Sequence, residues 1–198
     1  MNILRYTAAF FLAAGLITGA ASCSQRTVTR VDPNKVIDLS GKWNETDARL
    51  CAESLVSQAL GGDWLGNFSN AQKRKPVVVV GLVRNNSHEH MDTEIFTKDV
   101  EKAFIKSTMI RLVTAGEKRN ELRGERADQQ DFSSTETMKK FGREIGADFI
   151  MQGTVKSIVD SYGREKTTFW QVDMELTNIE TNEIVWIGDY KGKKYIVN

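Results

Sequence analysis

Alternating apolar and polar residues mark the C-terminal part of the chain, from Gly146 to Lys194. In its middle segment every second residue is apolar, and these residues are Trp170, Val172, Met174 and Leu176. A period of two is typical of a strand with one buried face and one wet face. Three consecutive segments of this kind predict a β-meander.

Parity sets the register of the last hairpin. One face of the final segment carries Ile184, Trp186, Gly188 and Tyr190. Trp186 faces the core together with Met174 and Leu176 only if the hairpin loop has an odd number of residues. A type I turn within 180–183 that closes with Asn182 in the left-handed region, as a G1-type bulge, gives such a loop.

The other face of this hairpin is predicted to expose three apolar side chains among polar neighbours: Phe169, Val185 and Ile187. Apolar groups gain little from contact with water, so we expect them to form a small docking patch for a partner. Partial cover by a helix or loop is the alternative. The lysines Lys191, Lys193 and Lys194 form a basic edge nearby, which we expect to deter pairing with another strand.

The residues before the first strand predict one helix with aromatic flanks. Asn44 or Thr46 caps the helix, and Gly61-Gly62 ends it. Its buried face is predicted to carry Leu50, Leu55 and Ala59. The rim of the core is predicted to be closed by Trp43, Trp64 and Phe68.

An unbroken β-branched run, Val77–Val80, predicts a central strand buried on both faces by helices above and below. After a loop over 84–91, a helix runs from Asp92 or Thr93 to Ser107, and a second strand covers 110–113. Strand, helix and strand over this distance join parallel neighbours.

Two more helices are predicted before the meander. A shorter one starts at Glu117, a polar loop covers 127–133, and another begins at Ser133. The resulting order is α-β-α-β-α-α-β-β-β. It predicts an α/β (α+β) fold, a single domain over residues 41–198 with a mixed β-sheet, flanking helices and a C-terminal meander.

Composition fits this single domain. The chain has 198 residues, of which 40% are hydrophobic and 27% charged. Lys and Arg number 27 against 26 Asp and Glu, a formal net charge of +1. A nucleic-acid-binding protein should show a basic excess, so we expect no nucleic-acid partner.

The N-terminus predicts a lipoprotein signal over residues 1–22. Arg5 precedes an apolar run over 7–17 that is too short to span a bilayer, and small residues follow it. The segment Ala20-Ala21-Ser22-Cys23 resembles the bacterial lipoprotein signal, in which the cysteine sulfur is acylated. An ordinary cleavage site is the alternative. Residues 23–40 would then be the lipidated cysteine and a short tether.

Candidate chemistry is sparse. The segment His88-Glu89-His90, with Asp92 close behind, is the best candidate for a metal site, yet the chain has only 2 histidines. No phosphate loop, nucleophile elbow or Ser/His/Asp pattern is present in the sequence. Cys51 lies on a helical apolar pattern and is expected to be a core residue. We therefore predict a binding protein without metal or cofactor, not an enzyme.

Three segments carry a family resemblance. Residues 146–153 and 174–186 resemble the LpoB family of penicillin-binding-protein activators, and 77–83 followed by Asn85-Asn86-Ser87 is similar to that family's first strand and loop. The sheet pattern also resembles CsgG-like and TolB N-terminal domains. The lipoprotein signal with Ser24 after Cys23 resembles proteobacterial signals for transfer to the outer membrane.

The LpoB resemblance implies a lipoprotein of the outer membrane, facing the periplasm, that binds a class A penicillin-binding protein and activates peptidoglycan synthesis without being an enzyme. The best-known members of the family have a long linker, whereas the tether here is short. Two other functions remain open. One is a structural subunit of a CsgG-like envelope or secretion assembly, and the other is a metal-assisted hydrolase that uses His88 and His90.

Overall fold

The computed structural model describes residues 27–33, 35–131 and 146–197. The chain divides into two units, Met1–Lys35 and Val36–Asn198. In the first unit, residues 27–33 and 35 are exposed and irregular. The helices and strands described below all belong to the second unit.

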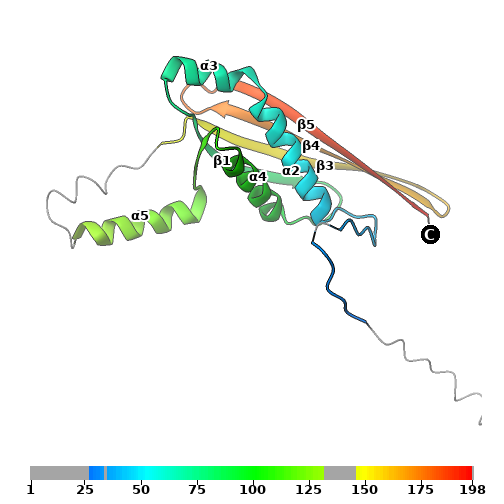
Figure 1. The fold of residues 1–198 in the computed structure, drawn as a ribbon. Helices are drawn as coiled ribbons and strands as arrows, with labels where there is room; N and C mark the ends of the chain where they lie inside the picture. Colours follow the sequence, from blue (N-terminus) through cyan, green and yellow to red (C-terminus); the bar gives the residue numbers. More distant parts are fainter. Residues whose placement is uncertain (1–26, 34, 132–145, 198) are drawn as a thin grey trace, which may run out of the picture. The chain divides into compact units, whose positions relative to one another are not determined.

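A five-stranded mixed sheet forms the centre of the second unit, in the order β2-β1-β3-β4-β5 (Figure 1). The strands are β1 (Val77–Asn86), β2 (Arg111–Val113), β3 (Phe149–Tyr162), β4 (Glu165–Asn178) and β5 (Ile184–Val197). β1 pairs in parallel with β2 and β3, whereas β3, β4 and β5 pair antiparallel. The predicted meander and the predicted parallel neighbours are both confirmed.

β1 is longer than predicted. Val77–Val80 is buried, as expected, but the strand continues through Arg84 to Asn86, where a loop was predicted. These last residues pair with Thr154 to Lys156 of β3. Because β3 is 14 residues long, it offers backbone hydrogen-bond partners to β1 beyond the apolar run of β1. The local sequence of β1 does not reveal this pairing.

The helices α2 (Glu45–Leu60) and α4 (Thr93–Ser107) lie on one face of the sheet, called here the inner face (Figure 1). α2 packs on α4 and β5, and α4 packs on β1 and β2. Asn44 and Asp92 cap the two helices, as predicted: the Asn44 side chain accepts from the backbone N–H groups of Thr46 and Asp47.

The buried stripe of α2 differs from the prediction in one residue. Its members recur at helical spacing and are Ala48, Cys51, Ala52, Leu55, Val56 and Ala59. Leu50 was predicted to be buried, but it is 43% exposed because its position falls off this stripe. Cys51 is a buried, free cysteine in this stripe, and burial raises the pKa of its thiol.

A helix that was not predicted, α3 (Asp63–Gln72), follows α2 and ends at Lys73 in the left-handed region. The helix α5 (Gly116–Asp131) is longer than predicted and includes 127–131, which were expected to be loop. Its residues are mostly good helix formers, which favours continuation of the helix. The predicted helix from Ser133 lies outside the described residues.

The inner face of β4 provides much of the core: Trp170, Val172, Met174 and Leu176 are all buried. Trp43 packs edge to face on Trp170, with ring centroids 6.0 Å apart, which confirms its predicted place at the rim. Within the described residues, no helix is both long and apolar enough to cross a membrane.

Candidate functional site

The predicted docking patch does not exist as one surface. Phe169 and Ile187 both face away from α2 and α4, on what is called here the outer face. Phe169 lies opposite Ile158 and Lys193, whereas Ile187 lies opposite Glu175. Phe169 and Glu175 are six residues apart on β4, a separation of about 20 Å at ~3.4 Å per residue. The side chains that lie between Phe169 and Ile187 on this face of the sheet are polar.

Val185 points to the inner face instead. The register shifts between Leu176, which pairs with Trp186, and Thr177, which pairs with Ile184, so Val185 is the extra residue of a β-bulge. It is half-buried and packs against the hydrophobic core together with Trp186. The bulge interrupts strict alternation, and for this reason the prediction that Val185 shares a face with Ile187 is wrong.

The predicted turn and the predicted core-side position of Trp186 are confirmed. Asn182 has φ +60, and the loop 179–183 between β4 and β5 has an odd number of residues. Trp186 packs on the core side, opposite Leu176. Ile184, which was placed on the same buried face, is 56% exposed beside the bulge.

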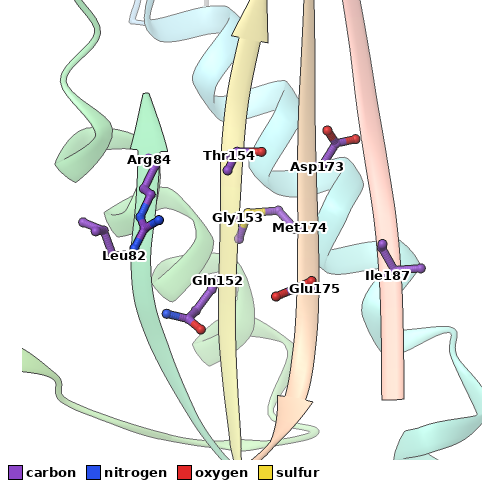
Figure 2. A pocket seen from close by; sticks show the side chains of 9 residues that line it. All are labelled: Leu82, Arg84, Gln152, Gly153, Thr154, Asp173, Met174, Glu175 and Ile187. Carbon is purple, nitrogen blue, oxygen red and sulfur yellow. The ribbon is translucent and has the colours of Figure 1, made fainter. Parts of the chain in front are cut away.

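Ile187 lines a shallow groove of about 270 Å³ on the outer face (Figure 2). The other lining residues are Leu82, Arg84, Gln152, Gly153, Thr154, Asp173, Met174 and Glu175. Asp173 accepts a hydrogen bond from Gln171 at 2.6 Å and lies 3.7 Å from the ammonium group of Lys156. Among the described residues, Arg84 and Glu175 have no ion-pair partner. The outer-face groove therefore has a mostly polar lining, with the apolar side chains of Leu82, Met174 and Ile187.

A second groove, of about 570 Å³, lies where α3 meets the β4–β5 turn and is called here the aromatic groove. Its volume is within the range of ligand sites. Its lining includes Trp64, Phe68, Phe149 and Trp186, together with Val185 and Ile184. Trp64 and Phe68 both pack edge to face on Phe149, with centroids 5.1 and 5.2 Å away. Trp64 also donates to the carbonyl of Ala59 at 2.7 Å, which fixes its ring.

Two glycines make room for the Trp186 ring at the wall of this groove. A Cβ at Gly188 would lie 2.3 Å from the six-membered ring of Trp186, and a Cβ at Gly62 would lie 3.2 Å from the five-membered ring. Any larger residue at Gly188 would push the indole away. The ring is therefore held between the end of α2 and its own strand, with part of its surface open to the groove.

The rim of the aromatic groove is acidic and polar. Asp63 and Asn67 come from α3, Asn178 is the last residue of β4, and Glu183 comes from the β4–β5 turn. Within the described part of the chain, the Glu183 carboxylate accepts one long hydrogen bond, 3.3 Å, from the Thr181 hydroxyl. Sequence reasoning missed this site because α3 was not predicted and because the bulge that brings Val185 to it has no local signal.

The predicted histidine loop is used for internal contacts. The backbone N–H of His88 donates to Ser157 Oγ at 2.9 Å, and the His88 ring Nδ1 lies 3.1 Å from the same oxygen. Glu89 accepts from the backbone N–H of Trp43 at 3.0 Å. Within the part of the chain that the structure describes, no three His, Cys, Asp or Glu side chains gather where they could hold a metal ion.

The three lysines predicted as one basic edge lie on two faces. Lys191 and Lys193 are exposed on the outer face of β5, but Lys194 points inward. Its ammonium nitrogen lies 2.6 Å from carboxylate oxygens of both Asp38 and Asp47. Partial burial lowers the pKa of Lys194, but its hydrogen bonds to the two carboxylates outweigh this effect and the pKa lies above its ordinary value. Lys194 thus fastens the start of the domain to β5.

The described residues form a mixed α+β domain with two grooves on its surface. A family model described as "Peptidoglycan-synthase activator LpoB" matches residues 47–191. The chain therefore belongs to the LpoB family, whose members are regulatory activators of penicillin-binding proteins. The resemblance given by the meander and the first strand is thereby confirmed.

Solved structures of similar proteins include two LpoB C-terminal domains. The one from Escherichia coli is 20% identical, with a TM-score of 0.45, and the match covers 74% of this chain and 98% of that chain. The one from Salmonella enterica is 18% identical, with the same TM-score and coverage. The PelC dodecamer from Paraburkholderia phytofirmans is 16% identical, with a TM-score of 0.32, covering 62% of this chain and 72% of that chain. No curated protein matches the chain.

Proposed function

We propose that this chain is a lipoprotein of the outer membrane, anchored through Cys23 and facing the periplasm, that binds a class A penicillin-binding protein and stimulates its peptidoglycan synthesis. The family match carries this proposal, because it extends from the first turn of α2 into β5 and so includes strands β1 to β4, the first part of β5 and both grooves. The activator performs no bond chemistry itself in this account; it acts by docking.

The sequence before the domain supports the anchor. The apolar run over 7–17 is followed by small residues and by Cys23, a pattern that fits acylation of the cysteine. Each buried CH₂ of an acyl chain contributes about 0.8 kcal/mol, so several chains would hold the protein on the membrane. Cys23 lies outside the described residues.

The length of the tether limits where the partner can be met. Between Cys23 and Val36, where the second unit begins, there are twelve residues, 24–35. Fully extended, they span about 42 Å at ~3.5 Å per residue, and as a flexible coil about half of that. The synthase must therefore present its docking surface close to the outer membrane, and we propose that the relevant part of the synthase extends across the periplasm.

Capture from membranes tests this function. Mature lipoprotein with a C-terminal affinity tag is incubated with detergent-solubilised membranes of its own organism, and retained penicillin-binding proteins are detected with a fluorescent β-lactam. We expect a class A synthase to be retained, and a tagged unrelated lipoprotein to retain none. If the only retained species are those that the unrelated lipoprotein also retains, the proposal fails.

A further inference from the structure

We infer that the aromatic groove receives a basic side chain, arginine or lysine, from a surface segment of the partner. The identity of that partner as the synthase rests on the proposed function, but the chemistry of the groove does not. Three features carry the inference: aromatic ring surface in the wall, two carboxylates on the rim, and a cation already bound to the same aromatic cluster.

The wall presents aromatic surface that is fixed in place. Trp186 is held between Gly62 and Gly188, and it remains half-buried. Phe68, also half-buried, lies across the groove on α3 and packs on Phe149. Ring faces of Trp and Phe attract cations, and Trp does so most strongly. A ring that is already rigid loses little conformational entropy when a side chain stacks on it.

The rim adds negative charge without a cation to balance it. Asp63 lies at the first position of α3, and Glu183 lies in the turn on the other side of the groove. Among the described residues, neither carboxylate has an ion-pair partner. The charge of the nearby Arg74 is already neutralised by Asp148, to which the two terminal guanidinium nitrogens donate at 2.7 and 2.6 Å. The groove therefore has an unbalanced charge of two carboxylates.

The same cluster already binds a guanidinium elsewhere. Arg74, which does not line the groove, lies 5.0 Å from the centroid of the Phe68 ring. Asp148 holds the same guanidinium, so this contact is an example, beside the groove, of a cation over a ring with a carboxylate close by.

Charge also decides against a purely apolar occupant. An apolar side chain seated in the groove would remove water from Asp63 and Glu183 and leave two carboxylates unpaired, which is unfavourable. A lysine or arginine stacks its aliphatic stem on the aromatic wall and places its charge between the carboxylates. The exposed Ile184 at the mouth adds apolar contact for the residues beside it.

Charge reversal on the rim, Asp63→Lys with Glu183→Lys, tests the inference. The matched control reverses two exposed carboxylates outside the groove, Glu94→Lys with Asp160→Lys, and so has the same net charge. A neutral pair, Asp63→Asn with Glu183→Gln, guards against a folding defect in the reversed pair. Each full-length mature protein is titrated against the captured synthase at low and at physiological salt, after circular dichroism and thermal melting have been compared with wild type.

We expect the reversed pair to weaken binding at least tenfold, the neutral pair to weaken it less, and the control to remain within twofold of wild type. Binding of the wild type should also weaken with salt more than that of the neutral pair. If both groove pairs bind as tightly as wild type, the inference is wrong although the proposed function stands.

If wild type binds no class A synthase, the proposed function fails, and a small probe then decides the inference. N-acetyl-arginine amide is titrated into the ¹⁵N-labelled protein, with N-acetyl-citrulline amide as the uncharged control of similar shape. A chemical-shift change at the Trp186 indole N–H that only the arginine probe produces, and that Asp63→Asn with Glu183→Gln removes, supports the inference. No difference between the two probes refutes it.

Discussion

Asp148 joins three strands, so its removal should destabilise the fold by a predictable amount. Its carboxylate binds the two terminal guanidinium nitrogens of Arg74 and accepts a hydrogen bond from the backbone N–H of Val77 at 2.8 Å. Its backbone N–H donates to Val77, and its carbonyl accepts from Ile179 after β4. Asp148→Ala keeps the backbone bonds but removes every side-chain contact.

The magnitude follows from how exposed each contact is. The Arg74 side chain is 45% exposed, so solvent screening keeps the contribution of the ion pair small. Val77 is buried, and an N–H that loses its charged acceptor costs about 1–3 kcal/mol. We expect Asp148→Ala to lower the free energy of unfolding by about 1–3 kcal/mol. Asp148→Asn retains an acceptor for Val77, so we expect a loss of about 1–2 kcal/mol.

The loss should depend on pH with a defined sign. Partial burial raises the pKa of Asp148, but the hydrogen bonds from Arg74 and from Val77 N–H outweigh it, so the pKa lies below its ordinary value of 3.8. A carboxyl group whose pKa is lower in the folded than in the unfolded state stabilises the fold at pH values above its unfolded-state pKa. This stabilisation is lost as the pH falls through its folded-state pKa. The gap between wild type and Asp148→Asn should therefore be full at pH 7 and close below pH 3.8.

Urea unfolding followed by tryptophan fluorescence at pH 7 and at successively lower pH measures this gap. Asp160→Ala, which removes an exposed carboxylate of β3, is the control and should change stability by less than about 0.5 kcal/mol. If Asp148→Ala costs no more than Asp160→Ala, or if the Asp148→Asn gap is the same at pH 7 and in acid, the reasoning about this junction is wrong.

Three further predictions concern the anchor, the bulge and the start of the domain. Cys23→Ala should abolish palmitate labelling and release the protein from membranes, as fractionation will show. Val185→Asp should lower the free energy of unfolding by more than about 2 kcal/mol, whereas Ile187→Asp should change it by less than about 0.5 kcal/mol in urea titrations. Lys194→Met should lower the free energy of unfolding by about 1–3 kcal/mol at pH 7, because Asp38 and Asp47 lose their cation. Since the pKa of Lys194 is raised in the folded protein, this difference from wild type should disappear only above pH 10.5.

Local patterns predicted the elements of the sheet well because the meander strands each have one buried face, whereas the valine run of β1 is buried throughout. The period of two placed Trp170 and Trp186 on the core side, and Asn182 identified the hairpin turn. The order strand, helix, strand predicted the parallel pairing of β1 and β2, which the structure shows.

The candidate site was not predictable in the same way, because its position depends on pairing between distant residues. The bulge opposite Leu176 turns Val185 inward, and no turn residue marks it in the sequence. The distance between Phe169 and Ile187 follows from strand register, which alternation alone does not fix. α3 has a glycine, Gly66, in its interior and few apolar residues, so tertiary packing of Trp64 rather than propensity stabilises it.

Stimulation of a class A synthase is the most direct test of the account. Mature lipoprotein in detergent is added to the purified synthase of the same organism, and the rate of glycan polymerisation is followed by consumption of a fluorescent lipid-linked disaccharide precursor. We predict a rate that rises and saturates with the concentration of the lipoprotein, and a smaller rise with Asp63→Lys combined with Glu183→Lys. A rate that stays constant at concentrations well above that of the synthase would contradict the proposal that this chain is an activator.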